Sequence, residues 1–258
     1  MIDISIISTF LLVMVRITTF FVTAPIFSAK GVAAQFKIGL GFFIALLIIP
    51  IVGINLNITD LNGTFLFYLF QEALIGLTIG WVAQLMFTSI QVAGSFVDLQ
   101  IGFSLANVID PQTGAQSPVM GNFKYTFAVL LFFALDIHHI FIEGIIASYQ
   151  FLPISGEWVV RLNDEPILLF ILAIFAKMFV VAFKIAAPIV ITLFLADVAL
   201  GIIARTVPQL NVFVVGIPMK VMLNFLLLSL ISASLIYIFK DLFQEMINSI
   251  SQFLELMR

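Results

Sequence analysis

The chain has 258 residues, of which 62% are hydrophobic and only 10% charged, and its net charge is −3. A soluble domain is roughly 45–50% apolar and about 25% charged, so a water-soluble fold could not cover this much apolar surface. The composition therefore predicts a single domain, residues 1–258, of packed membrane helices. The few scattered charges give no basic face for nucleic acid, and the lack of cysteine excludes disulfides and thiolate catalysis.

Six apolar stretches are long enough to cross a membrane, since about 20 helical residues span a hydrocarbon core of ~30 Å. They cover residues 4–24, 36–54, 64–94, 123–150, 166–204 and 212–239. The third and fifth stretches are longer than one crossing requires, and Pro188 should kink or divide the fifth. We therefore predict an all-α membrane protein of about six long helices, some broken or kinked, packed within a larger assembly.

Two segments differ from these stretches. Residues 94–122 form a long polar loop rich in Gly, Asn, Asp, Gln, Ser and Pro, and unusually long loops in compact proteins are often functional. In the tail, residues 240–258, apolar residues such as Leu242, Met246 and Ile250 recur at helical spacing. The tail is predicted to be an amphipathic helix on a surface or against a partner.

Ionisable side chains within apolar helices are costly and are therefore candidates for function. Asp136, His139 and Glu143 would share one face of a continuous helix, and such a set could hold a metal ion or relay protons. A metal site would need a further ligand, and His138 and His139 are the only histidines of the chain. The pattern therefore favours a polar contact between helices, or a helix end at the membrane surface, over a metal centre.

Basic residues also lie within the apolar stretches, among them Arg16, Lys177, Lys184 and Lys220. Lys177 and Lys184 are seven residues apart, so they would share a helix face. They could form a charge path or an anion site, but we favour snorkelling to an interface or pairing with acidic residues, for which the candidates are Glu72, Asp136 and Asp197. The same two interpretations apply to Arg16 and Lys220.

A third pattern is a stripe of small and polar residues in the stretch 64–94. Glu72, Gly76, Gly80 and Gln84 recur every four residues. Glycines at this spacing let a second helix approach closely, and the polar residues can hydrogen-bond across the contact. The stripe predicts a helix-packing face.

The sequence shows no motif for catalysis. A phosphate-binding loop, a His-Glu-x-x-His zinc motif and a nucleophile elbow are all missing from it. We therefore predict no enzyme activity, no cofactor and no metal. The residues alone support a membrane protein of transport type. A secondary transporter or ion channel for small solutes stays open, because broken helices and intramembrane charges are typical of transporters.

The segment from Ala187 to Lys220 resembles the signature of the FliR/SpaR/YscT family, membrane components of flagellar and virulence type III export machines. Its matching residues are Ala199, Leu200, Gly201, Arg205, Pro208, Gln209, Asn211, Val212, Phe213, Gly216, Pro218 and Lys220. Further matches are Glu72, Gly76, Gly80, Asp98, Gln100, Gly102, Asp110, Pro111, Gly114, Pro118 and His138. The chain departs from the family at Ala33, where a proline is usual.

The resemblance implies a structural and gating subunit of the flagellar type III protein export apparatus, forming part of the channel for unfolded proteins. A homologous subunit of a virulence injectisome is the alternative. The implied partners are several copies each of FliP-like and FliQ-like membrane proteins, then FlhB-like and FlhA-like components. The implied location is the bacterial cytoplasmic (inner) membrane, as a multi-pass protein of the flagellar basal body.

In this family the long polar loop acts as a plug, and irregular backbone at membrane depth is tolerated where it lines a cavity. We expect the segment from Leu105 to Gly121 to close the pore, with a connector that only packs subunits as the alternative. Its candidate residues are Leu105, Asn107, Asp110, Pro111, Gln112, Gly114, Gln116, Pro118 and Gly121.

A second group of residues is expected to serve helix packing and assembly rather than transport chemistry. Asn211 should cap a helix that begins at Val212, and Arg205 should satisfy carbonyls at a helix end. The prolines should end or bend helices. The full group is Glu72, Gly76, Gly80, Asp98, Gly102, Arg205, Pro208, Gln209, Asn211, Gly216, Pro218 and Lys220.

Overall fold

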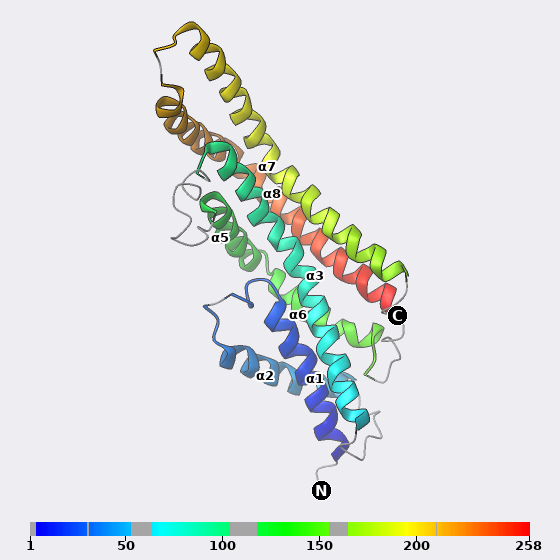
Figure 1. Ribbon diagram of the computed structural model, residues 1–258. Coiled ribbons are helices and arrows are strands. Elements are labelled where there is room, and N and C mark those ends of the chain that lie inside the picture. The colour runs from blue at the N-terminus through cyan, green and yellow to red at the C-terminus, as the bar shows by residue number, and fades with distance from the viewer. Residues whose placement is uncertain (1–3, 30, 53–62, 104–117, 155–164, 210) are drawn as a thin grey trace. The chain divides into compact units, whose positions relative to one another are not determined.

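The computed structural model describes residues 4–29, 31–52, 63–103, 118–154, 165–209 and 211–258. Every regular element within these ranges is a helix (Figure 1), which confirms the predicted all-α class. The helices are α1 (Ile4–Thr23), α2 (Ala34–Val52), α3 (Gly63–Ile101), α5 (Val119–Ala134), α6 (Ile137–Phe151), α7 (Glu165–Thr206) and α8 (Val212–Met257).

Four of these helices, α1, α3, α7 and α8, are long and apolar enough to cross a membrane. The count rises to five if α5 and α6 together form one broken span. Helices suit a bilayer because all of their backbone hydrogen bonds lie within the segment itself. This explains how stretches rich in Ile, Val and Phe, which are weaker helix formers than Leu or Ala in water, adopt helices here.

The helix interruptions differ from those expected. α7 continues through Pro188, so a division at that residue was wrong. A proline removes only one backbone hydrogen bond, and the apolar surroundings favour helix on both sides of it. α8 likewise continues through Pro218 and through the predicted tail to Met257. The break lies instead between α5 and α6, where Asp136 adopts a left-handed conformation with φ 56°.

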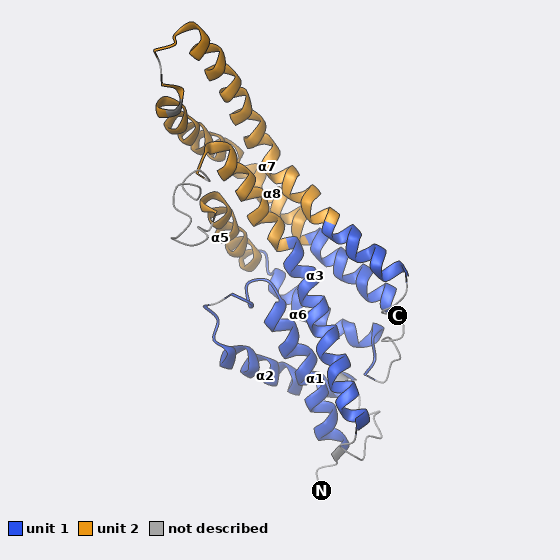
Figure 2. Cartoon of the chain, viewed as in Figure 1, with its two compact units in different colours: residues 1–86, 135–175, 244–258 blue, residues 87–134, 176–243 orange. Residues whose placement is uncertain are grey.

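The described residues form two compact units (Figure 2). Unit 1 comprises residues 1–86, 135–175 and 244–258, and unit 2 comprises residues 87–134 and 176–243. The helices α3, α7 and α8 each contribute residues to both units. The predicted single domain stays a prediction, and the two units are described separately below.

The core of unit 1 is built from α1, α3, α6 and the last turns of α8. Its buried residues include Ile17, Phe20, Ile79 and Ile145, and the rings of Phe20 and Phe141 lie 5.9 Å apart between centroids. α2 packs against α1. The apolar side of the predicted tail belongs to this core, since its side chains at Met246, Ile250, Phe253, Leu254 and Met257 are buried.

The core of unit 2 centres on a cluster of aromatic rings. The ring centroid of Phe87 on α3 lies 5.6 Å from that of Tyr125 and 6.0 Å from that of Phe132, both on α5. It lies 5.9 Å from the ring centroid of Phe243 on α8. Aromatic pairs at these separations add to the stabilisation that comes from buried area. The cluster therefore fixes α3, α5 and α8 against one another.

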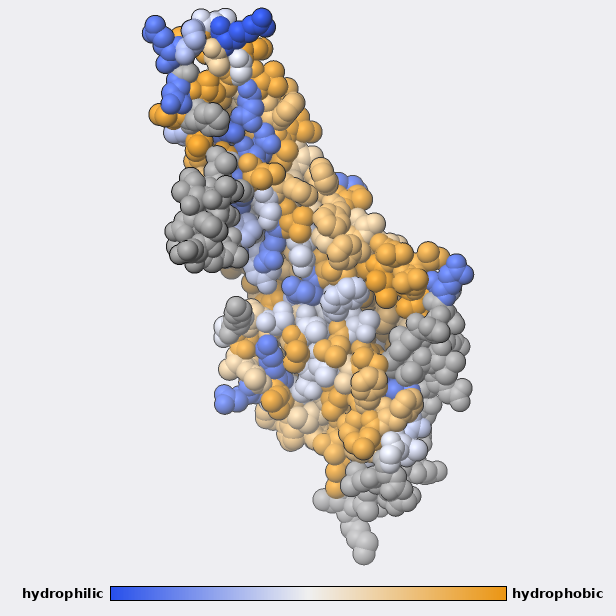
Figure 3. Space-filling view, viewed as in Figure 1, coloured by the Kyte–Doolittle hydropathy of each residue, from blue (hydrophilic) through white to orange (hydrophobic). Residues whose placement is uncertain are grey.

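Large apolar side chains also lie on the outside of both units. Leu47 of unit 1 is 74% exposed, and Met222 of unit 2 is 75% exposed. Figure 3 shows such residues over much of the visible surface. Apolar surface on this scale is typical of proteins that face lipid or a hydrophobic assembly.

Candidate functional site

A buried ion pair joins α1 and α3 in unit 1. Arg16 donates from its Nε to Glu72 Oε2 at 2.6 Å and from an Nη to Oε1 at 2.7 Å. The same guanidinium donates to Ser148 Oγ at 3.0 Å and to the carbonyl of Leu152 at 2.8 Å, and it lies 3.9 Å from the ring centre of Tyr149. Because both side chains are almost fully buried, this two-pronged contact holds α1, α3 and α6 in one arrangement.

The predicted packing stripe of α3 faces α1, one and two turns beyond this ion pair. A side chain at Gly76 would meet the Arg16 carbonyl and Thr19 Oγ1, and one at Gly80 would meet the Phe20 carbonyl at 2.8 Å. The hydroxyl of Thr23 donates to the Leu77 carbonyl at 3.1 Å across the same contact. Close glycine contact and interhelical hydrogen bonding are thus both present, as the spacing predicts.

The loop predicted for residues 94–122 is shorter in the structure, because α3 continues to Ile101 and α5 begins at Val119, and Asp98 joins these two helix ends in unit 2. Its backbone carbonyl accepts from Gly102 N at 3.1 Å and from Phe103 N at 3.0 Å, which closes the end of α3. Gly102 has φ 103°, a conformation that favours glycine at helix ends. Both carboxylate oxygens of Asp98 accept from Met120 N at 3.1 Å. Because that amide belongs to the first turn of α5, Asp98 acts as a cap from another helix.

Three further features surround this contact. A side chain at Gly94 of α3 would overlap the backbone of Gly121 on α5. Lys124 is 1% exposed and lies within electrostatic reach of Asp98. Asn224 of α8 is also buried, and its Nδ2 approaches Met120 Sδ at 3.2 Å. The base of the loop is therefore a close, polar junction of three helices, which we call the loop base: Gly94, Asp98, Met120, Gly121, Lys124 and Asn224.

Most of the predicted plug residues lie outside the described part of the chain. These are Leu105, Asn107, Asp110, Pro111, Gln112, Gly114 and Gln116. Of the other two, Pro118 directly precedes α5 and its carbonyl accepts from Asn122 N at 2.8 Å. Gly121 belongs to the loop base. The structure therefore describes how the segment is anchored.

A second polar junction in unit 2 joins α3, α7 and α8. Lys220 Nζ lies 3.0 Å from Asp197 Oδ1 and donates to the Gln100 carbonyl at 2.8 Å. Gln100 Nε2 in turn donates to Asp197 Oδ2 at 2.8 Å. The three residues form a closed ring of contacts next to the end of α3.

We expect the substitution Lys220→Met to destabilise unit 2 by no more than about 1 kcal/mol. The Asp197 side chain is 38% exposed, and ion pairs that are not fully buried contribute little to stability. Denaturant unfolding of the detergent-solubilised chain measures the change, with Met222→Leu, an exposed site on the same helix, as the control. A loss above about 3 kcal/mol would show instead that the pair behaves as a buried one.

The acidic partners expected for Lys177 and Lys184 pair elsewhere. Glu72 pairs with Arg16, and Asp197 with Lys220. The pairing expected for Lys177 and Lys184 stays a prediction, and the structure shows that Glu72 and Asp197 each contact a cation on another helix of the same unit. Opposite charges in the middle of two apolar helices were the signal for the Arg16–Glu72 pair, but hydropathy alone does not show which helices touch.

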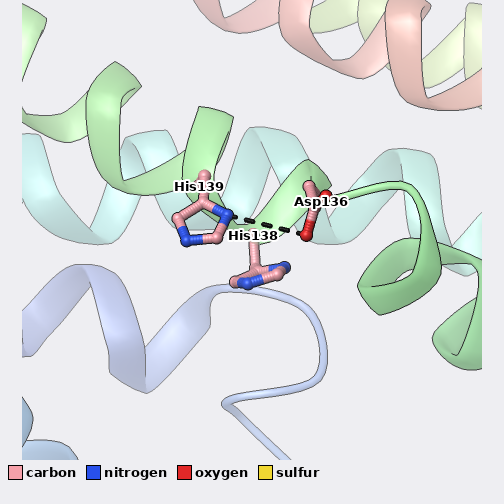
Figure 4. A group of neighbouring side chains, drawn as sticks. All are labelled: Asp136, His138 and His139. Atoms are coloured by element: carbon pink, nitrogen blue, oxygen red, sulfur yellow. Dashed lines mark ion pairs between the residues drawn. The ribbon is translucent and has the colours of Figure 1, made fainter.

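The expected helical face of Asp136, His139 and Glu143 is interrupted by the break before α6. Asp136 Oδ1 lies 3.8 Å from His139 Nδ1, and His138 lies beside both residues (Figure 4). Glu143 instead lines a cavity of about 200 Å³ in unit 1 with apolar residues of α1, α3, α6 and α8. The structure thus groups Asp136 with the two histidines.

The remaining assembly candidates lie at or near the junction of α7 and α8. Asn211 directly precedes α8 and its Oδ1 accepts from Val214 N at 3.4 Å, which is the expected cap. Arg205 is exposed in the last turn of α7, where a cation interacts favourably with the helix dipole. Exposed Pro208 and Gln209 follow α7, buried Gly216 lies near Leu200, and exposed Pro218 lies inside α8.

Known proteins resemble this chain over nearly its whole length. The family described as "Bacterial export proteins, family 1" matches residues 7–246. The flagellar biosynthetic protein FliR of Bacillus subtilis is 42% identical over 247 residues, covering 96% of this chain and 95% of that protein. FliR of Pectobacterium carotovorum is 32% identical over 96% of this chain and 93% of its own length, and FliR of Escherichia coli is 29% identical over 91% and 88%.

Proposed function

Because the chain belongs to the bacterial export proteins, family 1, we propose that it is a structural and gating subunit of the flagellar protein-export apparatus. Its relatives are flagellar biosynthetic proteins that it matches over nearly their whole length. This match supports a component of a flagellar export apparatus. We further propose that the chain forms part of the channel through which unfolded proteins leave the cytoplasm.

The buried polar contacts support a structural role. Three of the charged contacts described above join different helices of one unit: Arg16–Glu72 in unit 1, and those of Asp98 and Lys220 in unit 2. Such contacts set the arrangement of helices, as a scaffold requires. The extensive exposed apolar surface of both units supports contact with lipid and with other membrane subunits.

We propose FliP-like and FliQ-like proteins as these subunits, in several copies each, with FlhB-like and FlhA-like components beyond them, in the inner membrane at the flagellar basal body. Purification of the tagged chain from native membranes in a mild detergent, followed by native mass spectrometry, tests this. One copy with several copies of two small membrane proteins would support the proposal. A chain that emerges alone and folded would contradict it.

The single observation that most supports a gating role is the anchoring at Asp98. One residue closes the end of α3 and caps the start of α5, so the polar segment leaves and re-enters the fold at one point. We therefore propose that the segment between the anchors closes the channel until a substrate enters.

Deletion of residues 108–114 should raise the ion conductance of the resting, assembled complex, because the barrier would be shortened while the loop base stays intact. The measurement is single-channel or vesicle conductance of the purified complex. The matched control deletes residues 56–60, another polar connection, and should leave the leak unchanged. A normal closed-state leak after the first deletion, in a complex of normal composition, would assign the segment to subunit packing.

A further inference from the structure

The helix break before α6 brings three metal-ligating side chains together. Asp136, His138 and His139 each offer one ligand atom, and the three atoms lie within 4.8 Å of one another. Figure 4 shows the carboxylate and both imidazole rings gathered at the start of α6. We propose that this cluster binds a divalent transition-metal ion of the zinc type.

The first argument is the placement of the rings. Neighbouring residues of a regular helix point about 100° apart, so their side chains normally diverge. The ring centroids of His138 and His139 are nevertheless only 4.1 Å apart, with 38° between the ring planes. Two imidazole rings that lie side by side can both direct a nitrogen to one ion, and imidazole is the commonest metal ligand in proteins.

The second argument is the orientation of Asp136. An aspartate directly before a helix normally accepts a hydrogen bond from the second or third amide of that helix. Asp136 makes no such side-chain bond, because its left-handed backbone, φ 56° and ψ 23°, directs the side chain elsewhere. Its Oδ1 lies 3.8 Å from His139 Nδ1 instead. A carboxylate so placed would offset the charge of an ion held by the two rings.

The geometry suits a small, flexible coordination sphere. Zinc binds nitrogen and carboxylate oxygen at about 2.0–2.2 Å, so the ligands of one tetrahedral ion lie roughly 3.3 Å apart. The Asp136 and His139 side chains are 76% and 67% exposed, and small rotations of such side chains bring the three atoms to that spacing. Three protein ligands leave a fourth position for water or for a group from a neighbouring subunit. Imidazole with carboxylate favours Zn²⁺, Ni²⁺ or Cu²⁺ over Mg²⁺ or Ca²⁺.

Glu143 provides a matched control. It is an exposed carboxylate on the same helix. With Asp136 and His139 it forms the set that a continuous helix would bring together. In the structure it lines the apolar cavity of unit 1 instead. If the helix break creates the site, His138 contributes to metal binding and Glu143 does not.

The experiment uses the full chain in detergent, purified with a histidine-free affinity tag and stripped with a chelator. Zn²⁺ is titrated by calorimetry, and Co²⁺ is followed by its visible absorption. We expect one ion per chain. Since changes to residues behind metal ligands already lower affinity about 10–100-fold, His138→Ala, His139→Gln and Asp136→Asn should each lower it at least about tenfold.

Glu143→Gln should leave the affinity within about twofold, well below the tenfold effect of losing a ligand. Unchanged binding in all three ligand variants would show an adventitious ion elsewhere on the chain and would overturn the proposal. An equal loss in Glu143→Gln and His139→Gln, with none in His138→Ala, would return the site to the continuous-helix set. His139→Gln and Asp136→Asn alter exposed side chains, and asparagine tolerates the left-handed conformation, so the test does not depend on His138→Ala folding normally.

Discussion

Replacement of Glu72 by alanine should lower the free energy of unfolding by about 3–5 kcal/mol, the usual cost of leaving one member of a buried ion pair without its partner. Arg16 has no exposed surface, and both of its contacts to Glu72 are shorter than 2.8 Å. Ser148 and the Leu152 carbonyl accept two further hydrogen bonds from the guanidinium but carry no net charge. The cation would therefore stay buried without a counter-charge.

Reversible unfolding of the purified chain in mixed micelles measures this loss. Glu72→Gln keeps an oxygen acceptor at the same position and should be less damaging than Glu72→Ala. The double variant Arg16→Met with Glu72→Leu removes both charges and fills much of the same volume, so it should recover most of the lost stability. A loss below about 1 kcal/mol for Glu72→Ala would mean that the pair is hydrated like a surface salt bridge.

Several features of this protein could be predicted from the sequence because they depend on local properties of the chain. The all-α class, the apolar segments and the glycine face of α3 follow from hydropathy and spacing, which are local properties. Asn211 as a helix cap is local in the same sense, because residue type and position near a helix start decide it. The structure agrees with these predictions, except that it divides the stretch 123–150 between α5 and α6.

Contacts between distant residues could not be predicted in the same way. The sequence shows that Arg16 and Glu72 are expensive in an apolar helix, but not that α1 and α3 pack so that they meet. The left-handed backbone of Asp136 is a further case. Aspartate tolerates this conformation but does not require it, so nothing in the local pattern separates a break at Asp136 from a continuous helix over 123–150. The grouping of the two histidines with Asp136 follows from that break.

The loop base could be predicted from the sequence only in part. Of its residues, Asp98 was expected to matter through resemblance to a family, and Gly121 as part of the loop. The structure adds that Asp98 serves both ends of the segment and that Gly94 and Gly121 let α3 and α5 touch through their backbones. Two glycines that lie 27 residues apart carry no spacing signal, because they belong to different helices.

Replacement of Gly94 by valine should therefore be the most damaging single change in unit 2. The first carbon of the new side chain would fall on the backbone of Gly121 and 2.9 Å from the carbonyl carbon of Met120. Backbone cannot rotate away as a side chain can, so α3 and α5 must separate. We expect a loss of about 3 kcal/mol or more, at the upper end of the cost of overpacking. Unfolding of the purified chain measures it.

Gly201→Val provides the control for Gly94→Val, because Gly201 lies on α7 in the same unit and has no atom within 4 Å of the added carbon. Equal unfolding curves for the two valine variants would show that α3 and α5 do not touch as described.

Asp98→Asn tests the neighbouring hydrogen bonds without forcing the helices apart. It keeps an oxygen acceptor for Met120 N and should cost about 1–2 kcal/mol. If the proposed gate depends on anchoring, both Gly94→Val and Asp98→Asn should raise the resting conductance of the assembled complex, with the larger increase in Gly94→Val. If it depends only on the residues between the anchors, Asp98→Asn should leave the conductance unchanged, and the loop base would then serve stability alone.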